Sequence, residues 1–365
     1  MQVQRINRDR SAGARRMSTA AAAWAARRAF AAGRGILTGR MGAALALSAL
    51  CLPALLSAGV ARAVTVPVVV SGGQDGDLKI WDASGRLQAT IGRHEGGVNA
   101  MALVPGAAGT LVTAGADKLI MIWNLATLKL QTTLTGSAGA VYAVAVHPGG
   151  DIIATGGEDH MIRLWSRSSG RQLAIAQAHG DAVRALAFSP DGAYLVSGGA
   201  DKLLRFWKTA PAPDGGLNIV MQTNTIAHDD TIESIAISPD SKLVASASDD
   251  ETVKIWNIDG SGIRTRIKVG GKGVNCVSFS PDGAAIVTGD EEGKVRFWNV
   301  ATGAPIPFAA AHGRGVHCIG WSSNGKVIVT GSADKTLRYW SLPDGTELAK
   351  IAAHDGAVNA LAVLP

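Results

Sequence analysis

Seven tryptophans recur along the chain at an almost constant interval, and this interval constrains the fold more than any other feature. Successive members are separated by 42, 42, 42, 49, 42 and 42 residues. An internal period of about 40 to 45 residues indicates a repeat architecture in which each unit supplies a few strands and packs against its neighbours. The seven tryptophans are Trp81, Trp123, Trp165, Trp207, Trp256, Trp298 and Trp340.

The residues around each tryptophan favour strands and tight turns. Each tryptophan ends a short apolar segment, such as 78–81, and turn sequences such as Ser189-Pro190-Asp191-Gly192 follow an apolar-rich strand. Pro-Asp-Gly between such segments is a hairpin signal. We therefore predict an all-β fold over residues 64–365, a seven-bladed β-propeller of four-stranded blades.

Three further positions repeat with the tryptophan. A carboxylate lies six residues before it and a Ser or Thr ten residues before it in all seven repeats, and a histidine precedes five of them. This pattern resembles the WD-repeat family over the whole of residues 64–365. In that family the four side chains form a buried hydrogen-bond chain that fastens each blade, which suits groups that can satisfy one another without water.

The resemblance implies five complete sets of these fastening residues. They are His94 with Thr113, Asp117 and Trp123; His179 with Ser197, Asp201 and Trp207; His228 with Ser246, Asp250 and Trp256; His312 with Thr330, Asp334 and Trp340; and His354 with Ser71, Asp75 and Trp81. Two repeats depart from the pattern, because Ser137 and Gly270 replace the histidine and the second repeat has Glu292 for Asp. We expect these two blades to be held more weakly.

The fifth set joins the two ends of the predicted domain. His354 follows the last tryptophan, whereas Ser71, Asp75 and Trp81 lie at the beginning. The segment 358–363 should therefore supply the inner strand of the first blade, which closes the ring and removes exposed edges.

One repeat is seven residues longer than the others. The extra residues lie around 210–216, in a Pro/Gly-rich segment expected to be a loop between outer strands. A tolerated insertion is a simpler interpretation than a binding loop.

Cys276 and Cys318 occupy one repeat position, where the other repeats have Ala or Ser. Buried thiols acting as small apolar groups explain them.

Charge is distributed unevenly. Residues 1–63 carry ten Arg and one acidic residue, a net +9, so that the remainder of this +6 chain carries −3. A basic region, an apolar run over 41–60 and the sequence Ala61-Arg62-Ala63 describe a secretory signal peptide cleaved before Val64. We expect export to a bacterial periplasm, by the general route or, from Arg27-Arg28, by the twin-arginine route.

Other interpretations of residues 1–63 stay open. The run 41–60 is long enough to remain as an inner-membrane anchor, and an Arg-rich, acid-poor start also fits a mitochondrial presequence. Met17 or Met41 is an alternative start. The mildly acidic remainder and the lack of a basic stripe disfavour nucleic-acid binding.

The sequence carries no catalytic or metal motif. Ser, His and Asp occur together five times and always with a tryptophan, whereas a catalytic triad is needed once. There is no phosphate-binding loop, nucleophile elbow or Cys/His cluster with zinc spacing. We expect no enzyme activity, cofactor or metal.

What differs between repeats is a better guide to partners than what recurs. One variable position lies just inside each predicted inner strand, and the family resemblance places it around the channel mouth on the narrower face. Aromatic and Arg side chains dominate many binding surfaces. The seven residues are Asn99, Tyr142, Arg184, Glu233, Asn275, His317 and Asn359.

Acidic residues gather on the same predicted face. They occur in three groups over two neighbouring repeats, 229–233, 249–251 and 290–292. With Asp250 and Glu292 set aside as fasteners, Asp249 and Glu291 remain to bind a basic protein segment or, as a weaker alternative, calcium. We therefore predict a monomeric, non-enzymatic protein-interaction scaffold, with an enzyme or small-ligand binder at the channel mouth as the alternative.

Overall fold

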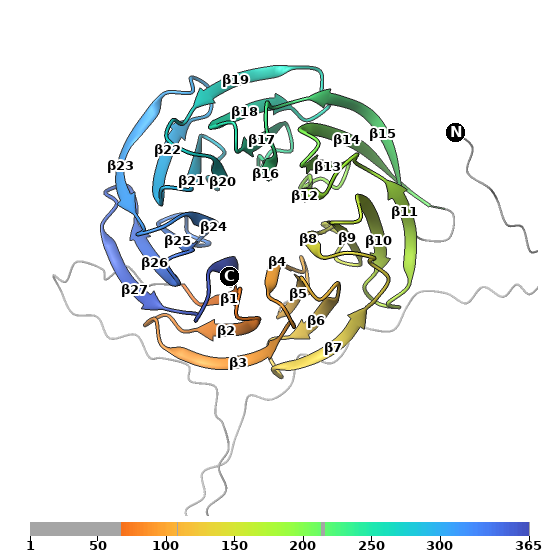
Figure 1. Cartoon of the computed structure of the whole chain (residues 1–365), viewed down its shortest axis with the longest axis horizontal. Helices are drawn as coiled ribbons and strands as arrows, with labels where there is room; N and C mark the ends of the chain where they lie inside the picture. The colour runs from red at the N-terminus through yellow and green to blue at the C-terminus, as the bar shows by residue number, and fades with distance from the viewer. Residues whose placement is uncertain (1–66, 108, 213–215, 365) are drawn as a thin grey trace, which may run out of the picture. The chain divides into compact units, whose positions relative to one another are not determined.

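The computed structural model describes residues 67–107, 109–212 and 216–364, which form 28 strands in seven four-stranded antiparallel sheets. The sheets are the blades of a β-propeller (Figure 1), as the tryptophan spacing predicts. The inner strand of each blade lies beside the inner strands of its two neighbours.

The blades are numbered from the first tryptophan. Blade 1 contains β28 (Val358–Val363), β1 (Val69–Gly73), β2 (Asp77–Trp81) and β3 (Leu87–Arg93). Blade 2 contains β4 (Val98–Leu103), β5 (Thr110–Gly115), β6 (Ile120–Asn124) and β7 (Lys129–Leu134). Blade 3 contains β8 (Val141–Val146), β9 (Ile152–Gly157), β10 (Met161–Ser166) and β11 (Gln172–Gln177).

The remaining four blades follow the same order from the inner to the outer strand. Blade 4 contains β12 (Val183–Phe188), β13 (Tyr194–Gly199), β14 (Leu203–Pro211) and β15 (Leu217–Ile226). Blade 5 contains β16 (Ile232–Ile237), β17 (Leu243–Ser248), β18 (Thr252–Asn257) and β19 (Ile263–Lys268). Blade 6 contains β20 (Val274–Phe279), β21 (Ala285–Asp290), β22 (Lys294–Asn299) and β23 (Pro305–Ala311), and blade 7 contains β24 (Val316–Trp321), β25 (Val327–Ser332), β26 (Thr336–Ser341) and β27 (Glu347–Ala352).

Each repeat tryptophan is buried in the core between its own blade and the preceding one. Trp165 of blade 3 packs with Val112 and Ile122 of blade 2, and Trp207 of blade 4 packs with Ile162 and Leu164 of blade 3. Burial of an indole removes a large apolar area from water. The 42-residue period therefore reflects one buried indole at each junction between blades.

The ring closes as the sequence predicts. β28 pairs antiparallel with β1, from Val69 opposite Val363 to Gly72 opposite Ala360 and, after a shift of one residue, Gly73 opposite Val358. His354 reaches Ser71 across the same junction, with 2.8 Å between Nε2 and Oγ. The first blade therefore contains strands from both ends of the domain.

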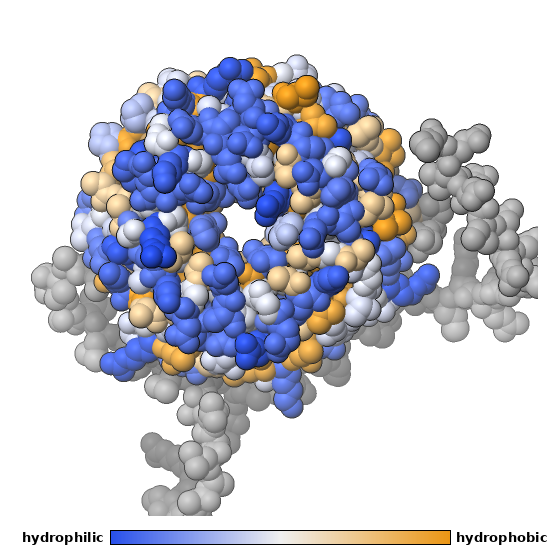
Figure 2. Space-filling model, viewed as in Figure 1, coloured by the Kyte–Doolittle hydropathy of each residue, from blue (hydrophilic) through white to orange (hydrophobic). Residues whose placement is uncertain are grey.

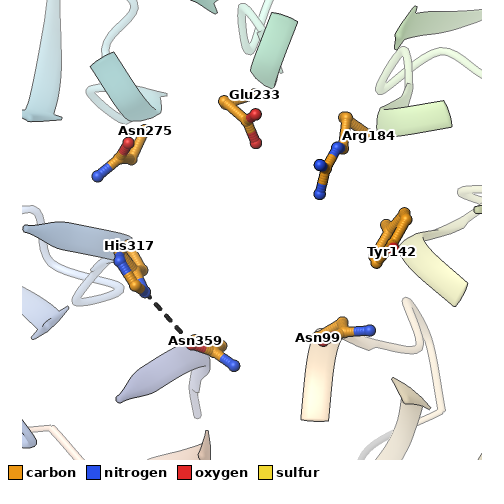
Figure 3. Close-up of a pocket in the computed structure, with 7 residues that line it drawn as sticks. All are labelled: Asn99, Tyr142, Arg184, Glu233, Asn275, His317 and Asn359. Carbon is orange, nitrogen blue, oxygen red and sulfur yellow. Dashed lines mark hydrogen bonds between the residues drawn. The ribbon is translucent and has the colours of Figure 1, made fainter. Parts of the chain in front are cut away.

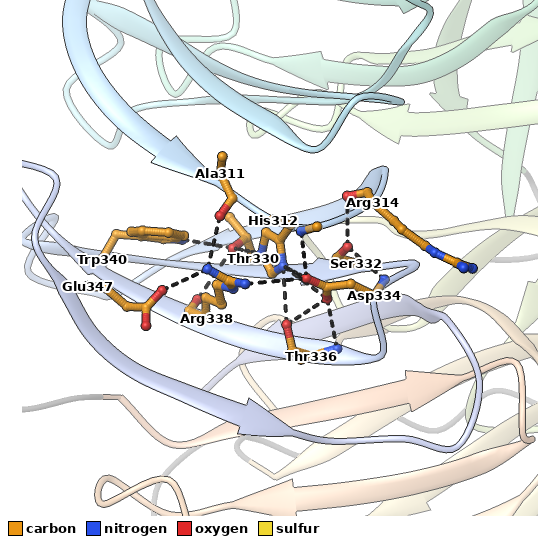
Figure 4. Close-up of polar contacts among 11 residues, drawn as sticks. Ala311, His312, Arg314, Thr330, Ser332, Asp334, Thr336, Arg338, Trp340 and Glu347 are labelled. Carbon is orange, nitrogen blue, oxygen red and sulfur yellow. Dashed lines mark hydrogen bonds and ion pairs between the residues drawn. The ribbon is translucent and has the colours of Figure 1, made fainter.

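The fastening residues form continuous hydrogen-bond chains, of which Figure 4 shows that of blade 7. There the indole N–H of Trp340 donates to Thr330 Oγ1 at 2.8 Å, and the hydroxyl lies 2.7 Å from His312 Nε2. His312 Nδ1 lies 3.1 Å from Asp334. Because a carboxylate only accepts, Nδ1 carries the proton and Nε2 accepts from the hydroxyl, which satisfies every polar atom of the chain.

Blade 2 has the same series of hydrogen bonds. In blade 2, the indole N–H of Trp123 donates to Thr113 Oγ1 at 2.9 Å, and this hydroxyl lies 2.7 Å from His94 Nε2. His94 Nδ1 lies 2.9 Å from Asp117 Oδ1. Thr113 and His94 are both 0% exposed. Thr113 and Asp117 therefore occupy the places that the family resemblance implies.

Two blades use serine in place of threonine. Ser197 of blade 4 accepts from its indole at 2.9 Å and lies 2.8 Å from His179 Nε2. Ser246 of blade 5 accepts from its indole at 2.9 Å and lies 2.7 Å from His228 Nε2. In both blades the histidine Nδ1 lies 2.8 Å from the turn carboxylate. With blade 1, which is closed by His354, all five predicted sets have their four side chains within hydrogen-bond distance.

The expectation that Glu292 fastens blade 6 is wrong. Its exposed side chain forms an ion pair with Lys294 at 2.6 Å. Asp290, which is 0% exposed, takes the structural role: its carboxylate pairs with Arg296 and accepts from the backbone N–H of Lys294 at 2.8 Å. Gly270 stands at the histidine position, so no imidazole is present to hold the carboxylate of Glu292. Arg296 instead holds Asp290, the last residue of β21.

A basic residue two positions before the tryptophan supports a buried or half-buried carboxylate in six blades. In blade 3, which lacks the histidine, Arg163 pairs with Asp159 at 2.7 Å, and both side chains are largely buried. The indole of Trp165 still donates to Thr155 at 2.8 Å. The blades expected to be weaker thus have an arginine contact in place of the imidazole. The six basic residues are Lys79, Arg163, Arg205, Lys254, Arg296 and Arg338, with Met121 in the seventh blade.

Other expectations concern single segments. The seven-residue insertion lies between the outer strands β14 and β15, as predicted, but most of it extends these strands to nine and ten residues. Cys276 and Cys318 are free thiols, and burial raises both pKa values. The predicted signal peptide, residues 1–63, lies outside the described residues. Within the described ranges, no helix is long and apolar enough to cross a membrane.

Removal of residues 352–365 should abolish cooperative folding, because blade 1 then loses both its inner strand and His354. Thermal unfolding followed by circular dichroism measures the effect. The full chain should show one cooperative transition, and the truncated chain should show none or one at a much lower temperature. A truncated chain that melts like the full chain would contradict the role of β28 in closure.

Acid should destabilise the propeller in two steps. Burial lowers the pKa of His179 and His312 to about 4, from an ordinary value of 6.5. Burial alone would raise the pKa of Asp201, but hydrogen bonds from Arg205 and the Gly180 N–H lower it from 3.8 to about 2. In the unfolded chain these groups have their ordinary pKa values, so they bind protons at a higher pH than in the folded chain. The free energy of unfolding should therefore fall from about pH 6.5 towards 4 through the histidines, and again below 3.8 through the aspartate.

Urea unfolding between pH 8 and pH 4 measures this loss, which we expect to be at least about 1 kcal/mol per histidine. His179→Gln is the matched control, because two blades already fold without the histidine and glutamine does not titrate. Its stability should change less between pH 6.5 and pH 4 than that of the wild type. A wild-type stability that is flat over this range would exclude the proposed linkage.

Candidate functional site

Seven side chains, one from each inner strand, line a single pocket of about 290 Å³ at the centre of the ring. Figure 2 shows an opening at this position, and Figure 3 shows the side chains around it. They are the seven variable residues singled out in the sequence, namely Asn99, Tyr142, Arg184, Glu233, Asn275, His317 and Asn359. We call this ring of seven residues the channel mouth.

A β-bulge in every inner strand places these residues. In blade 4, Val183 pairs with Gly199 and Ala185 with Gly198, so Arg184 between them has no partner in the ladder. The same shift occurs at the corresponding position of the other six blades. A bulge leaves one residue unpaired, shifts the register by one and redirects that residue's side chain, while pairing continues on both sides. The preceding Val or Ile is almost completely buried in each blade, which fixes the strand where the mouth residue turns inward.

The asparagines on one side of the mouth are held by hydrogen bonds to the next blade. Asn99 Nδ2 donates to the carbonyl of Val141 at 2.9 Å, and Asn359 Nδ2 donates to the carbonyl of Val98 at 3.0 Å. His317 Nδ1 lies 3.2 Å from Asn359 Oδ1 and must donate, because this oxygen can only accept. These side chains are therefore fixed in place before any ligand arrives.

The opposite side of the mouth is charged. The guanidinium of Arg184 lies over the ring of Tyr142, 4.6 Å from its centroid. Within the described part of the chain, Arg184 has no ion pair within 4.0 Å, and its buried Nε has no hydrogen-bond partner. Burial raises the pKa of Glu233; the charge of Arg184 opposes this effect, and Asp230 and Glu291 add to it.

Asp249 and Glu291 lie outside the seven pocket-lining residues but remain close enough to influence them. Asp249 follows β17, and its N–H donates to the carbonyl of Thr231 at 3.1 Å. Burial raises its pKa to about 6, and the negative charges of Glu233, Asp230 and Glu291 contribute. The acidic residues of blades 5 and 6 thus form a mutually repelling group beside the mouth. We call Asp230, Glu233, Asp249 and Glu291 the acidic rim.

The chemistry of the mouth is set by polar and charged side chains. Its side chains offer hydrogen bonds, one aromatic ring, one guanidinium and the carboxylate of Glu233, and the acidic rim adds further carboxylates beside them. The serines and threonines beside the histidines accept from the tryptophans. Among the described residues, no group of three His, Cys, Asp or Glu is arranged to hold a metal ion. The calcium alternative therefore gains no support from this part of the chain.

Sequence reasoning missed two features. The basic residue two positions before the tryptophan in six repeats is visible as a repeat position, and its recurrence could have identified it. The bulge is not visible in the sequence, because a valine followed by a polar residue has the same alternation in a regular strand.

Six segments of the chain match the WD40 family model, described as "WD domain, G-beta repeat". Together they make up more than half of the 365 residues. The chain belongs to the WD40 repeat family. The matched segments are 85–124, 128–166, 170–208, 221–257, 264–299 and 305–341. The strands outside these segments are β27 and β28 at one end of this WD40 propeller and β1 and β2 at the other, so the seventh repeat is divided between the two ends of the domain.

A curated relative matches over a shorter stretch. The WD40 chain is 38% identical over 76 residues to the ribosome biogenesis protein WDR12 homolog of Chlamydomonas reinhardtii. The match covers 20% of this chain and 16% of that protein. WD40 propellers generally bind other proteins and are generally non-enzymatic.

Proposed function

We propose that this WD40 propeller is a non-enzymatic scaffold of the periplasm that captures a basic segment of a partner protein at its channel mouth. One observation carries the proposal: the position that varies from blade to blade is the position that the bulge turns into a shared pocket. The recurring residues are used to hold the blades together, so the variable ones are available for recognition.

The charges at the mouth favour a basic partner. The acidic rim has four carboxylates, and among the mouth residues it is Arg184 that opposes the charge of Glu233 and Asp249. The pKa of Asp249 is raised in part because these carboxylates repel one another when ionised. A Lys or Arg side chain placed among them would relieve this repulsion.

Charge reversal of the acidic rim should abolish capture. We expect Asp249→Lys/Glu291→Lys to reduce crosslinking to the partner in intact cells at least about tenfold, since two attractive charges become repulsive. Glu158→Lys is the matched control, because Glu158 occupies the same turn position in blade 3, outside the acidic rim. It should leave capture unchanged.

A second variant tests the pocket itself. Tyr142→Ala/Arg184→Ala/Glu233→Ala removes three mouth side chains that, within the described residues, make no hydrogen bond to the rest of the fold. Partners lost in this variant and in the charge reversal would support the scaffold. If the wild type crosslinks to no protein, the scaffold proposal fails, and a small ligand of the mouth becomes the alternative to screen.

Export is the part of the proposal that rests on residues 1–63 alone. A mature chain that begins at Val64 would have an intact mass lower by that of residues 1–63, and it should be released by mild outer-membrane disruption. Intact-mass measurement of the protein from its native cells decides the question. A full-length mass with membrane association would instead favour an anchor over 41–60.

A further inference from the structure

Arg184 is held in the pocket of the channel mouth without an acceptor for its N–H groups. Its guanidinium lies over the ring of Tyr142, 4.6 Å from the centroid. Among the described residues it makes no hydrogen bond or ion pair, and its Nε is buried. Figure 3 shows the guanidinium directed into the pocket. The fold therefore fixes a cation at the mouth and leaves its donors free.

The other buried or half-buried arginines of the described chain all have an acceptor. Four of them pair with a carboxylate, and the fifth donates from its Nε to the carbonyl of Gly150 at 2.7 Å. A planar guanidinium binds a carboxylate through two parallel N–H groups, so Arg184 is suited to the carboxylate of a ligand. The five arginines used for comparison are Arg163, Arg167, Arg205, Arg296 and Arg338.

Glu233 of the neighbouring blade 5 also points into the pocket (Figure 3). Its carboxylate makes no hydrogen bond or ion pair within the described residues. Burial raises the pKa of Glu233, and the charge of Arg184 lowers it. The two groups are therefore close enough to interact but too far apart for a direct contact. A ligand that carries both charges could lie between them.

An isolated anion is a poor ligand for this pocket. The acidic rim has four carboxylates, whereas Arg184 contributes one positive charge. A ligand carboxylate on Arg184 would be repelled by the ionised rim. A positive charge on the same ligand would offset this repulsion by contacting Glu233. The charges at the mouth therefore favour a ligand that joins a carboxylate to a basic group.

The size of the pocket favours the end of a chain. Its volume of about 290 Å³ lies at the small end of the range for ligand sites, which is about 300–1,000 Å³. An internal segment would have to enter and leave through the same ring, whereas a chain end enters once. A C-terminal Lys or Arg residue has its α-carboxylate and its basic side chain on one residue, so both charges fit a pocket of this size.

We propose that the channel mouth binds the C-terminal residue of its partner, a lysine or arginine, with the α-carboxylate on Arg184 and the basic side chain on Glu233. The terminal carboxylate supplies the acceptor that the fold withholds from Arg184. Capture of a terminal carboxylate by fixed N–H donors is a recurrent mode of peptide recognition. The inference rests on the proposed capture of a basic segment and specifies which part of that segment enters the pocket.

Titration calorimetry with the full chain and three N-acetylated peptides tests the proposal. The first peptide is Gly-Ser-Gly-Ser-Lys with a free α-carboxylate, and the second is its C-terminal amide. The third is the amide of Gly-Ser-Gly-Glu-Lys, which carries its carboxylate on a side chain. The free acid should bind at least about tenfold more tightly than either amide, because it alone places a terminal carboxylate on Arg184.

Two variants separate the two contacts. Arg184→Gln should bind the free acid no more tightly than the first amide, because the guanidinium is lost. Glu233→Gln should weaken the binding of both peptides by a similar factor and keep the difference between them. Arg314→Gln is the matched control, because Arg314 is an exposed arginine in the loop before β24 and does not line the pocket. It should keep the wild-type affinities. Thermal unfolding like that of the wild type shows that each variant folds.

The outcomes distinguish this inference from the proposed function. Equal binding of the free acid and its amide overturns the inference and leaves capture of a basic segment intact. Equal binding of the Glu-containing amide places the carboxylate on a side chain and overturns the chain end as the ligand. An Arg184→Gln variant that still prefers the free acid also overturns it. If no peptide binds at about 5 mM, the inference fails, and crosslinking in intact cells decides the proposed function separately.

Discussion

The hydrogen bond from each indole to a buried hydroxyl is the contact on which the ring depends. Its length is 2.8–3.0 Å in all seven blades, including the two that lack the histidine. An indole N–H buried without an acceptor would cost about 1 to 3 kcal/mol. By satisfying this donor, the hydroxyl allows the large ring to enter the junction between blades, and each junction repeats the solution.

The polar network around that contact tolerates substitution as long as its buried or half-buried carboxylate has a partner. An imidazole serves in five blades and an arginine serves alone in two. In blade 4 both are present, since Arg205 and His179 contact Asp201 together. A buried or half-buried carboxylate is present in every blade, at the turn position in six of them and two residues earlier, at Asp290, in blade 6. It also accepts backbone N–H groups that turn the chain between strands. What changes from blade to blade is the group that balances its charge.

Much of this architecture could be predicted because the repeat multiplies weak signals. A single Ser-x9-Trp pair means little, but seven of them at one spacing specify the blades, the order of strands and the closure by β28. The assignment of Glu292 as a fastener is wrong because spacing gives the position of a residue in the repeat and not the group that its side chain contacts. The buried carboxylate of this blade lies two residues earlier, at Asp290. The sequence shows that acidic residues cluster in neighbouring turns. Which of them lines the pocket depends on the bulges, and the alternation of apolar residues does not reveal a bulge.

The bulges have a consequence for how such a protein changes over evolutionary time. A mouth residue has no cross-strand partner, and the buried Val or Ile before it carries the packing. Exchange of a mouth residue therefore leaves the strand ladder intact, so specificity can drift while the fold is retained. Residues that make two WD40 chains similar are mostly those that hold blades together. Inheritance of the repeat then says little about inheritance of the partner, which has to be established for each chain from its own seven residues.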